Sequence, residues 1–405
     1  MGRSLLKGGC VLSLDRKVGN FRVADVLIEE GRIAEVGPDL RARGAEVVDA
    51  ADTIVMPGFV DAHRHAWQSL SRGGGDGETA SGSAFSSDDV YAATLIGLLG
   101  AMEAGITGLV DWFDMPGGSH ADAAFQAHAD SGLRTVFVTS ARPEAAAAPK
   151  SSLTTIAAGG DDPGAWATAR EQGLRIHAHA ALSAEMRGLG VMAPMLGNDV
   201  TLVHGSYLED RDLDAVASSG AAIVLAPSSE MAGGLPPLDV QKLIDRGIRP
   251  GLAVDTERIG PGDLFAQMRA AISLQHARLF DLKLAGKAGL PKLLTTREVI
   301  RYATIDGARA IGLGEATGSL TPGKQADVVV LRTDRPNIYP INDPIGAVVW
   351  GMDTSNVDWV FVGGRPMMQS GSLVADVTRA RNLANDARER MTRASATLSP
   401  AGEAS

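Results

Sequence analysis

The sequence predicts an α/β protein: a (β/α)8, TIM-type barrel with a small β-sandwich built from both chain termini. Residues 56–315 alternate β-branched apolar runs with helical periods, which is typical of a parallel barrel. Residues 1–55 and 316–375 instead hold short apolar runs separated by turns. Neither end has enough strands to bury two faces, so we expect both ends to pair in one composite sandwich beside the inserted barrel.

Eight apolar runs in the middle of the chain are the candidate barrel strands. They are Val55–Ala62, Gly108–Phe113, Arg134–Thr139, Leu153–Ala157, Leu174–His179, Thr201–His204, Ala222–Ala226 and Gly251–Val254. Between them, apolar residues recur at helical spacing and stop at a glycine, as in 213–217 before Gly220 and 238–244 before Gly247. Strands that alternate with helices in this way predict the barrel.

Two further segments lie outside these strands. The Gly/Ser-rich residues 71–88 follow the first strand, where a barrel has its active face, and we expect either a lid or a mobile surface loop there. Residues 376–394 carry one apolar stripe and predict an amphipathic C-terminal helix that packs on the body. Residues 395–405 are expected to be a disordered tail.

Composition narrows the classes of partner. The chain of 405 residues has a formal net charge of -10 and a pI near 5.3, which gives no electrostatic reason to expect nucleic acid or an anionic membrane. A small-molecule substrate is expected instead. With Cys10 as the one cysteine, no intramolecular disulfide can form, and a cytoplasmic location is expected. The sequence contains no signal-peptide pattern and no run of about 20 apolar residues.

Histidines gather where the predicted strands end. His63 and His65 stand two residues apart on the first strand, so their side chains share one face, either as metal ligands or as two solvated imidazoles. Five of the eight histidines and one aspartate fall at the carboxyl ends of predicted strands: His63, His65, His177, His179, His204 and Asp255. The remaining three are expected at the surface or in packing: His120, His128 and His276. Imidazoles and a carboxylate suit a cation such as Zn²⁺ with a coordination position open for water, which indicates catalysis.

The run Pro57-Gly-Phe-Val-Asp-Ala-His-Arg-His65 resembles the Pro-Gly-x-x-Asp-x-His-x-His signature of the amidohydrolase superfamily. Residues 317–330 resemble the family's return into the sandwich and residues 304–310 its last barrel helix, so the resemblance covers nearly the whole chain. The most similar branch holds the metal-dependent aminohydrolases and chlorohydrolases of cytosine, guanine, adenosine derivatives and triazines. The resemblance implies a homo-oligomer, a dimer, and these site residues: metal ligands at His63, His65, His179 and Asp255, with His204 facing the substrate.

A mechanism follows from those positions as a hypothesis. One divalent ion, Zn²⁺ first and Fe²⁺ or Mn²⁺ as alternatives, would lower the pKa of its water toward ~7, and that water would attack an sp² carbon. Asp255 would accept the proton and pass it to the leaving group. His204 would polarise the developing oxyanion or hold the nucleophile, a role worth about 3 kcal/mol by analogy with other oxyanion donors. The alternatives are a helix cap for Asp255 and a satisfied core histidine for His204.

Two departures from the family pattern limit what carries over. The deaminase branch has a glutamate proton shuttle three residues after the ligand on strand five, where this chain has Leu182. On strand seven a usual His-Cys-Pro run is replaced by residues 225–231, in which Glu230 is the candidate replacement acid or else a solvated loop residue. Lys150 precedes the fourth strand rather than ending it, so one metal ion is expected rather than a carbamylated-lysine bridge.

The missing glutamate decides between reaction types. Ring deamination needs a ring nitrogen to be protonated as water adds, whereas hydrolysis of an amide, lactam or cyclic urea-like bond does not. The sequence therefore favours C–N hydrolysis of an amide-type substrate, with deamination or dechlorination of a purine, pyrimidine or triazine as the alternative. A non-catalytic relative kept for binding is the third hypothesis. Four candidate substrate-binding residues could equally be core or rim, with a core position favoured for the last: Trp67, Gln68, Trp112 and His177.

Overall fold

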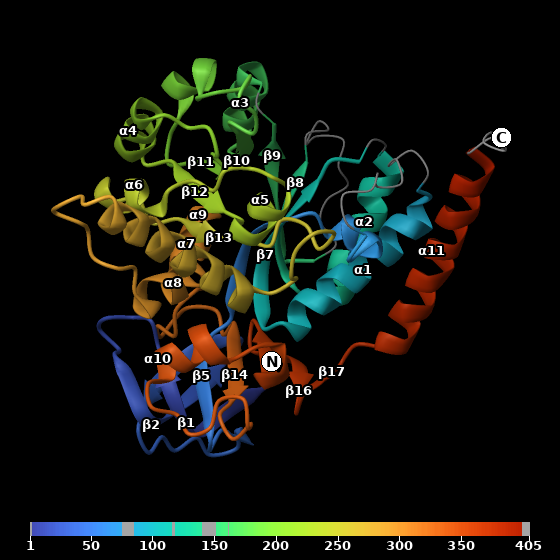
Figure 1. Cartoon of the computed structure of the whole chain (residues 1–405). Coiled ribbons are helices and arrows are strands. Elements are labelled where there is room, and N and C mark those ends of the chain that lie inside the picture. Colours follow the sequence, from blue (N-terminus) through green and yellow to red (C-terminus); the bar gives the residue numbers. More distant parts are fainter. Residues whose placement is uncertain (1, 75–84, 116–117, 140–150, 161, 399–405) are drawn as a thin grey trace, which may run out of the picture.

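The structure is a computed structural model that describes residues 2–74, 85–115, 118–139, 151–160 and 162–398. Figure 1 shows the barrel above a sheet that both chain ends share, with a long C-terminal helix along one side. Most of the predicted 71–88 loop, and Lys150, lie outside the described residues. Among the residues described, no helix is both long and apolar enough to cross a membrane.

Eight parallel strands form the barrel in chain order, which confirms the predicted fold class. They are β6 (Phe59–Arg64), β7 (Ile106–Phe113), β8 (Arg134–Thr139), β9 (Thr154–Gly159), β10 (Ile176–Ala180), β11 (Val200–His204), β12 (Ala222–Leu225) and β13 (Gly251–Leu252). The barrel closes between the residues that follow β13 and the end of β6. There Asp255 N–H donates to His63 O and His65 N–H donates to Asp255 O, both at 2.9 Å. The ring is therefore closed by the segment that carries the candidate ligands.

The predicted first strand, residues 55–62, is two strands. β5 (Thr53–Pro57) belongs to the sheet of the termini and β6 to the barrel, with Gly58 between them. A Cβ atom at Gly58 would lie 2.1 Å from Thr107 Cγ2, so only glycine fits where the chain crosses β7. This crossing point joins the two units directly.

The chain termini build one mixed sheet of nine strands. The N-terminal strands are β1 (Arg3–Leu12), β2 (Asn20–Glu29), β3 (Arg32–Gly37), β4 (Glu46–Asp49) and β5; the C-terminal ones are β14 (Val328–Arg332), β15 (Val357–Val362), β16 (Arg365–Gln369) and β17 (Ser372–Leu373). β5 pairs with β1 on one side and β14 on the other. Hydrogen bonds thus link all nine strands in one sheet, where the sequence predicted a sandwich. Both ends bury a common cluster that includes Val26, Ile28, Val328, Val330 and Phe361.

Helices accompany the strands of both units. They are α1 (Ser87–Glu103), α2 (Gly118–Ser131), α3 (Pro163–Glu171), α4 (Asp210–Ser219), α5 (Pro227–Ala232), α6 (Val240–Asp245), α7 (Leu264–Leu284), α8 (Thr296–Tyr302), α9 (Ile305–Ala310) and α10 (Pro344–Gly346). Helices α1 to α6 lie between strands of the barrel, α7 to α9 follow its last strand, and α10 lies between β14 and β15 of the terminal sheet. A 3₁₀ segment, Ala66–Ser71, follows β6. α9 closes the floor of the barrel, where Ala310 O accepts a hydrogen bond from Thr201 Oγ1 at 2.6 Å.

The C-terminal helix α11 (Val377–Leu398) packs on α1 (Figure 1). Ala380 and Ala387 are buried on its inner side, and Arg390 Nη2 lies 2.6 Å from Asp89 Oδ1 on α1. The helix runs four residues beyond the predicted end at 394, so residues 395–398 are helical rather than part of a tail. Residues 399–405 lie outside the described part of the chain.

Candidate active site

The carboxyl ends of three barrel strands bring the four candidate ligands together. β6 supplies His63 and leads into His65, β10 supplies His179, and Asp255 follows β13. His63 Nε2 lies 3.2 Å from His179 Nε2, and Asp255 Oδ1 lies 3.6 Å from Nε2 of both His63 and His65. His63 is fully buried, and its ligand atom lies within 4.8 Å of those of His65 and His179.

This donor set fits a divalent metal ion. Ligand atoms about 2.0–2.1 Å from a tetrahedral centre lie about 3.3 Å apart, close to the separations between these imidazole nitrogens and the carboxylate oxygen. Three nitrogens with one oxygen are a donor set that Zn²⁺ accepts.

The local environment favours the ligand-competent protonation states. Burial lowers the pKa of His63 to about 4 and holds the pKa of His179 well below its usual value. Burial would raise the pKa of Asp255, but its hydrogen bond to His63 and the nearby imidazoles outweigh burial and lower that pKa. His63 and His179 are therefore neutral and the Asp255 carboxylate is ionised at neutral pH, as metal coordination requires.

Two of the site residues have a strained, left-handed backbone conformation. His204 has φ 71° and Asp255 has φ 64°, both in the left-handed region that costs such residues about 1–3 kcal/mol. Alternation along β11 would turn His204 away from the axis, because Thr201 points inward to α9. The left-handed backbone brings its ring within 5.6 Å of the His179 ring and 5.9 Å of the His63 ring. Tertiary structure, rather than strand alternation, places His204 in the site.

Glu230 contacts the Nδ1 side of the His204 ring. Its Oε1 accepts from Ala226 N–H at 2.9 Å and lies 3.1 Å from His204 Nδ1, and the side chain is 2% exposed. Because an ionised carboxylate only accepts, Nδ1 of His204 donates and Nε2 is left to face the substrate. Burial would lower the pKa of His204, but the Glu230 hydrogen bond and the Asp255 charge outweigh burial and raise it.

Two residues near the ligands belong to no recognised sequence motif, and their place in the site was not predicted from the sequence. Ser229, on α5 after strand β12, donates from Oγ to Asp255 Oδ2 at 2.6 Å. Asp114, directly after β7, has Oδ1 3.9 Å from His65 Nδ1 and accepts from Trp67 Nε1 at 2.9 Å. The only sequence signal for either residue is a small polar side chain just past a strand end.

The four candidate substrate-binding residues have different surroundings. The Trp112 ring lies 4.2 Å from the His179 ring and 5.7 Å from the His63 ring, so Trp112 walls the ligand cluster. Trp67 packs edge-on against Phe85 at 5.8 Å among apolar residues of the flanking helices. Gln68 Oε1 accepts from Thr256 Oγ1 at 2.7 Å.

His177 lies deeper in the barrel than the ligands. It shares a face of β10 with His179 and is fully buried, and neither ring nitrogen has a hydrogen-bond partner among the residues that the structure describes. Burial lowers the pKa of His177 to about 3, so the ring is neutral. The sequence favoured a satisfied core histidine at this position; the side chain is buried, but its ring nitrogens are not hydrogen-bonded within the described part of the chain.

Buried polar networks support the closing segment. Arg64 is 1% exposed, donates from Nε to Asp61 Oδ2 at 2.7 Å and has Nη1 3.5 Å from Glu257 Oε1. Asp61 in turn accepts from Val254 N–H at 2.9 Å, which ties β6 to the residue before Asp255.

The three histidines outside the predicted site have different settings. His128 is fully buried on α2, with Nε2 2.8 Å from Asp111 Oδ2 and Nδ1 3.0 Å from Thr135 Oγ1. His276 on α7 donates from Nε2 to Leu294 O at 2.9 Å. His120 lies on α2. None of the three reaches the ligand cluster.

Known proteins resemble this chain in sequence and in fold. The model of the amidohydrolase family matches residues 54–367. A 5'-deoxyadenosine deaminase of Methanosarcina mazei is 26% identical, covering 91% of this chain and 93% of that protein. Among solved structures, a zinc-bound adenosine deaminase of Xanthomonas campestris has a TM-score of 0.81 at 19% identity, with 96% of this chain and 98% of that chain covered. A zinc-bound atrazine chlorohydrolase of Arthrobacter aurescens has a TM-score of 0.80 at 20% identity, with 95% and 100% covered.

These likenesses agree with the geometry of the site. The matched segment includes the whole barrel, the four clustered ligand candidates and most of the C-terminal part of the shared sheet. The fold agrees with that of zinc-bound hydrolases over nearly the full length of both chains. The chain belongs to the amidohydrolase family and is a hydrolase of that family.

Proposed function

We propose that the chain hydrolyses a carbon–nitrogen bond of a small molecule, with one divalent metal ion, Zn²⁺, held by His63, His65, His179 and Asp255. The observation that carries this proposal is the convergence of three imidazoles and one carboxylate at the carboxyl ends of the barrel strands. Such an ion lowers the pKa of its water toward about 7 and polarises the atom under attack.

The residues of the chain supply the proton transfers. Asp255 accepts a proton from the attacking water and delivers it to the leaving nitrogen, since its Oδ1 faces the cluster while Ser229 holds Oδ2. Because burial is outweighed by the Glu230 hydrogen bond and the Asp255 charge, which raise its pKa, His204 is suited to the doubly protonated form, in which Nδ1 donates to Glu230 and Nε2 donates to the developing oxyanion. Glu230 therefore serves as a positioning residue for His204.

Leu182 favours an amide, lactam or cyclic urea-like substrate. It stands where the deaminase branch has its glutamate shuttle. We infer that Glu230 holds His204 rather than replacing that acid, since its Oε1 is bonded to Ala226 and His204. A ring nitrogen would then lack a donor during addition, whereas an amide nitrogen can take its proton from Asp255. General acids of this kind contribute roughly 10²–10⁴-fold to a rate.

Deamination of an aminopurine is the second candidate. It is favoured by the relatives, one of which is named a 5'-deoxyadenosine deaminase. In this case Asp255 or His204 would also have to protonate the ring. Dechlorination is the corresponding reaction of the atrazine chlorohydrolase that shares the fold.

Leu182→Glu separates the two reactions. Metal-loaded enzyme is tested for ammonia release from 5'-deoxyadenosine and for ring opening of a panel of lactams and cyclic ureas, with Leu182→Met as the matched control. We expect wild type and Leu182→Met to open an amide-type ring, and Leu182→Glu to gain ammonia release. Rapid deamination by wild type, lost in Glu230→Gln, would reverse the preference in favour of the deaminase.

Location and assembly are also proposed. Cys10 is half-buried, and burial raises the pKa of its thiol, so it is a poorly reactive cysteine suited to a reducing cytoplasm. We propose a homodimer on family resemblance. Light scattering of the purified protein at several concentrations tests the dimer.

A further inference from the structure

A second cavity lies at the floor of the barrel, at the opposite end from the metal-ligand candidates. Its volume is about 520 Å³, within the range of small-molecule sites. It is lined by residues 14–17 between β1 and β2, by Arg249 before β13, by the ends of α8 and α9, and by residues 314–324. Both units of the fold therefore contribute to it.

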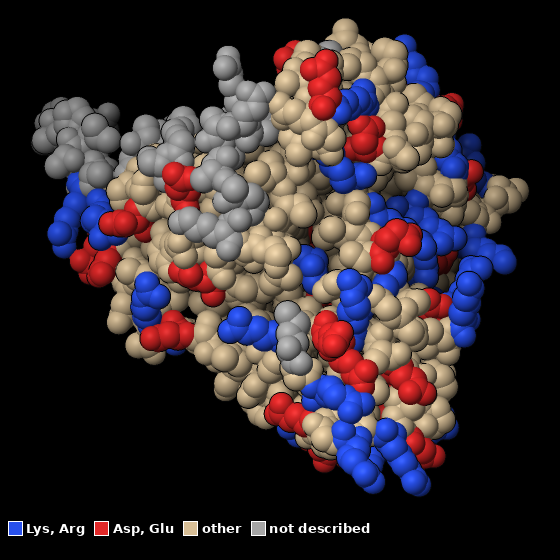
Figure 2. All heavy atoms as spheres, turned by 180° about the vertical axis from the view of Figure 1, so that it is seen from behind, with Lys and Arg blue, Asp and Glu red and all other residues tan. Residues whose placement is uncertain are grey.

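The walls of this floor cavity are cationic in a chain that is acidic overall. Six basic side chains line it, against the carboxylates of Asp15 and Glu315: Arg16, Lys17, Arg249, Arg301, Arg309 and Lys324. The whole chain has a formal net charge of -10. Figure 2 shows Lys and Arg side chains gathered on one flank, between the barrel and the sheet of the termini. Positive charge is thus concentrated at this cavity, whereas the net negative charge of the whole molecule would repel anions.

The carboxylates at the cavity do not neutralise its positive charge. Asp15 accepts from the backbone N–H of Lys17 at 2.6 Å and from Thr321 Oγ1 at 2.5 Å, so it is held by its own loop and by Thr321. The Thr321 hydrogen bond is the main reason that the pKa of Asp15 is lowered. Its oxygens are engaged mainly by these hydrogen bonds, and among the described basic side chains it is Lys324 whose charge contributes to the lowered pKa of Asp15.

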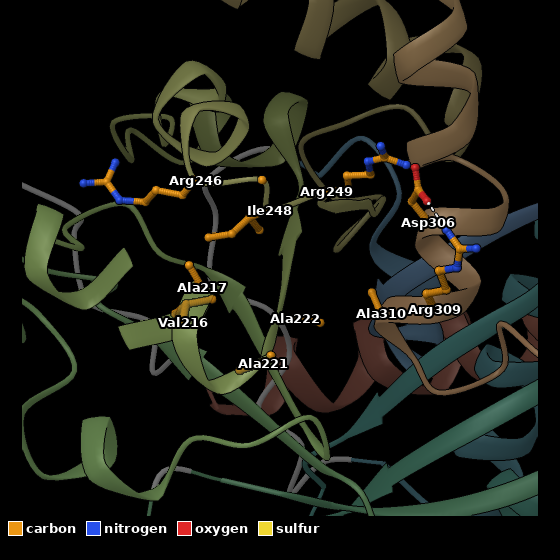
Figure 3. A pocket seen from close by; sticks show the side chains of 12 residues that line it. Val216, Ala217, Ala221, Ala222, Arg246, Ile248, Arg249, Asp306, Arg309 and Ala310 are labelled. Atoms are coloured by element: carbon orange, nitrogen blue, oxygen red, sulfur yellow. Dashed lines mark hydrogen bonds and ion pairs between the residues drawn. The ribbon is translucent and has the colours of Figure 1, made fainter. Parts of the chain in front are cut away.

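One further carboxylate is shared between two arginines. Asp306 Oδ1 lies 3.1 Å from both Arg301 Nη2 and Arg309 Nη1. Figure 3 shows Arg249 on the same side, beside Asp306, while Arg246 points away across the neighbouring cavity. Arg246 instead donates from Nε to Asp214 at 2.7 Å. Arg301 and Arg309 therefore share a single carboxylate.

The remaining basic side chains form no ion pair among the described residues, although the charges of Glu315 and Asp15 act on Lys324. Within the part of the chain that the structure describes, the side chains of Arg16, Lys17 and Arg249 form no ion pair and no hydrogen bond. Lys324 Nζ donates to two backbone carbonyl oxygens, Gly314 O at 2.5 Å and Thr317 O at 3.1 Å. Unpaired guanidinium forks beside a cavity are what a bidentate oxyanion ligand requires.

We propose that the floor cavity binds a small phosphorylated anion, as inorganic phosphate or diphosphate or as the phosphate group of a nucleotide. Arg249, Arg309 and Arg16 contact its oxygens, and Lys17 and Lys324 balance its charge. The site is separate from the candidate active site. A bound anion would clamp α9 in place beneath the strands, because Ala310 on α9 is bonded to β11 through Thr201.

Calorimetric titration of the metal-loaded enzyme tests this proposal. Phosphate, pyrophosphate and adenosine diphosphate are titrated separately at constant ionic strength set by chloride, and thermal unfolding is followed with each. We expect saturable binding to one site and a higher unfolding temperature than chloride alone gives. Tighter pyrophosphate binding would identify a free inorganic ligand, and tighter adenosine diphosphate binding a nucleotide. No saturable binding of any of the three, or the same stabilisation by chloride, would overturn the proposal.

Matched variants locate the bound anion. Arg249→Ser should weaken binding roughly ten- to hundredfold, the loss expected for charged hydrogen bonds. Arg246→Ser, the neighbouring arginine that points away, should bind as wild type does. His65→Ala should also bind normally, whereas lost binding in that variant would place the anion at the active site. Equal affinities of Arg249→Ser and wild type, or equal losses in Arg249→Ser and Arg246→Ser, would refute this site.

Discussion

Ser229→Ala tests whether a neighbouring hydroxyl orients the carboxylate that both binds metal and moves protons. Ser229 is 3% exposed, and its Oγ donates to Asp255 Oδ2 at 2.6 Å. A hydrogen bond to a charged group contributes about 1.5–3 kcal/mol, which corresponds to roughly ten- to 150-fold. Without it, Asp255 is free to rotate its Oδ1 away from His63 and His65. We therefore expect kcat to fall roughly ten- to hundredfold, with metal affinity lowered by a similar factor.

The assay titrates apo protein with Zn²⁺ against a competing chelator and then measures turnover of the best C–N substrate. Ser228→Ala is the matched control, because the Ser228 side chain has no hydrogen bond among the described residues and only its backbone N–H bonds to Gln267, at 3.1 Å. We expect that control to match wild type. The proposed role of Ser229 would be refuted by wild-type metal affinity and turnover in Ser229→Ala, or by an equal loss in Ser228→Ala.

Four further outcomes are expected. His63→Ala should lose turnover but keep the far-ultraviolet circular dichroism of the barrel; retained turnover would exclude the metal site. Dialysis against a strong chelator should remove activity and lower the unfolding temperature, with both restored by Zn²⁺ and not by Mg²⁺. Burial would raise the pKa of Asp89, but its hydrogen bonds to Ser86 and the Arg390 charge lower it. Its stabilising contribution is therefore present above the unfolded pKa of about 3.9 and lost as pH falls through the lower folded value. Arg390→Ala should flatten that acid limb in thermal unfolding curves and raise proteolysis of α11, whereas an unchanged profile would count against the contact. Removing residues 319–405 should leave β5 without β14 and give an insoluble product; a soluble, active fragment would contradict the shared sheet.

The barrel could be predicted because its evidence is local. Each strand is an apolar run bounded by turns, and each predicted run overlaps an observed strand. The split of residues 55–62 at Gly58 could not be predicted, since periodicity continues across it. Only the contact with Thr107, about fifty residues away in the sequence, forces the chain to pass from one unit to the other.

The ligand cluster could be predicted because β-strand alternation fixes where His63 and His65 point. The direction of His204 could not, because its left-handed backbone reverses the alternation of β11. Ser229 depends on where α5 begins after β12, which no single stretch of sequence specifies. The commitment of Glu230 to His204 likewise arises from two strands that meet only in the folded barrel.

The place of β5 between β1 and β14 has a consequence for synthesis on the ribosome. β5 emerges early, but its neighbour β14 follows only after the entire barrel has been translated. At usual elongation rates the open edge of β5 waits roughly tens of seconds for its partner. During that interval the nascent chain presents an unpaired apolar strand at the crossing into the barrel. Slower translation of the barrel would prolong this exposure and increase the demand for chaperones.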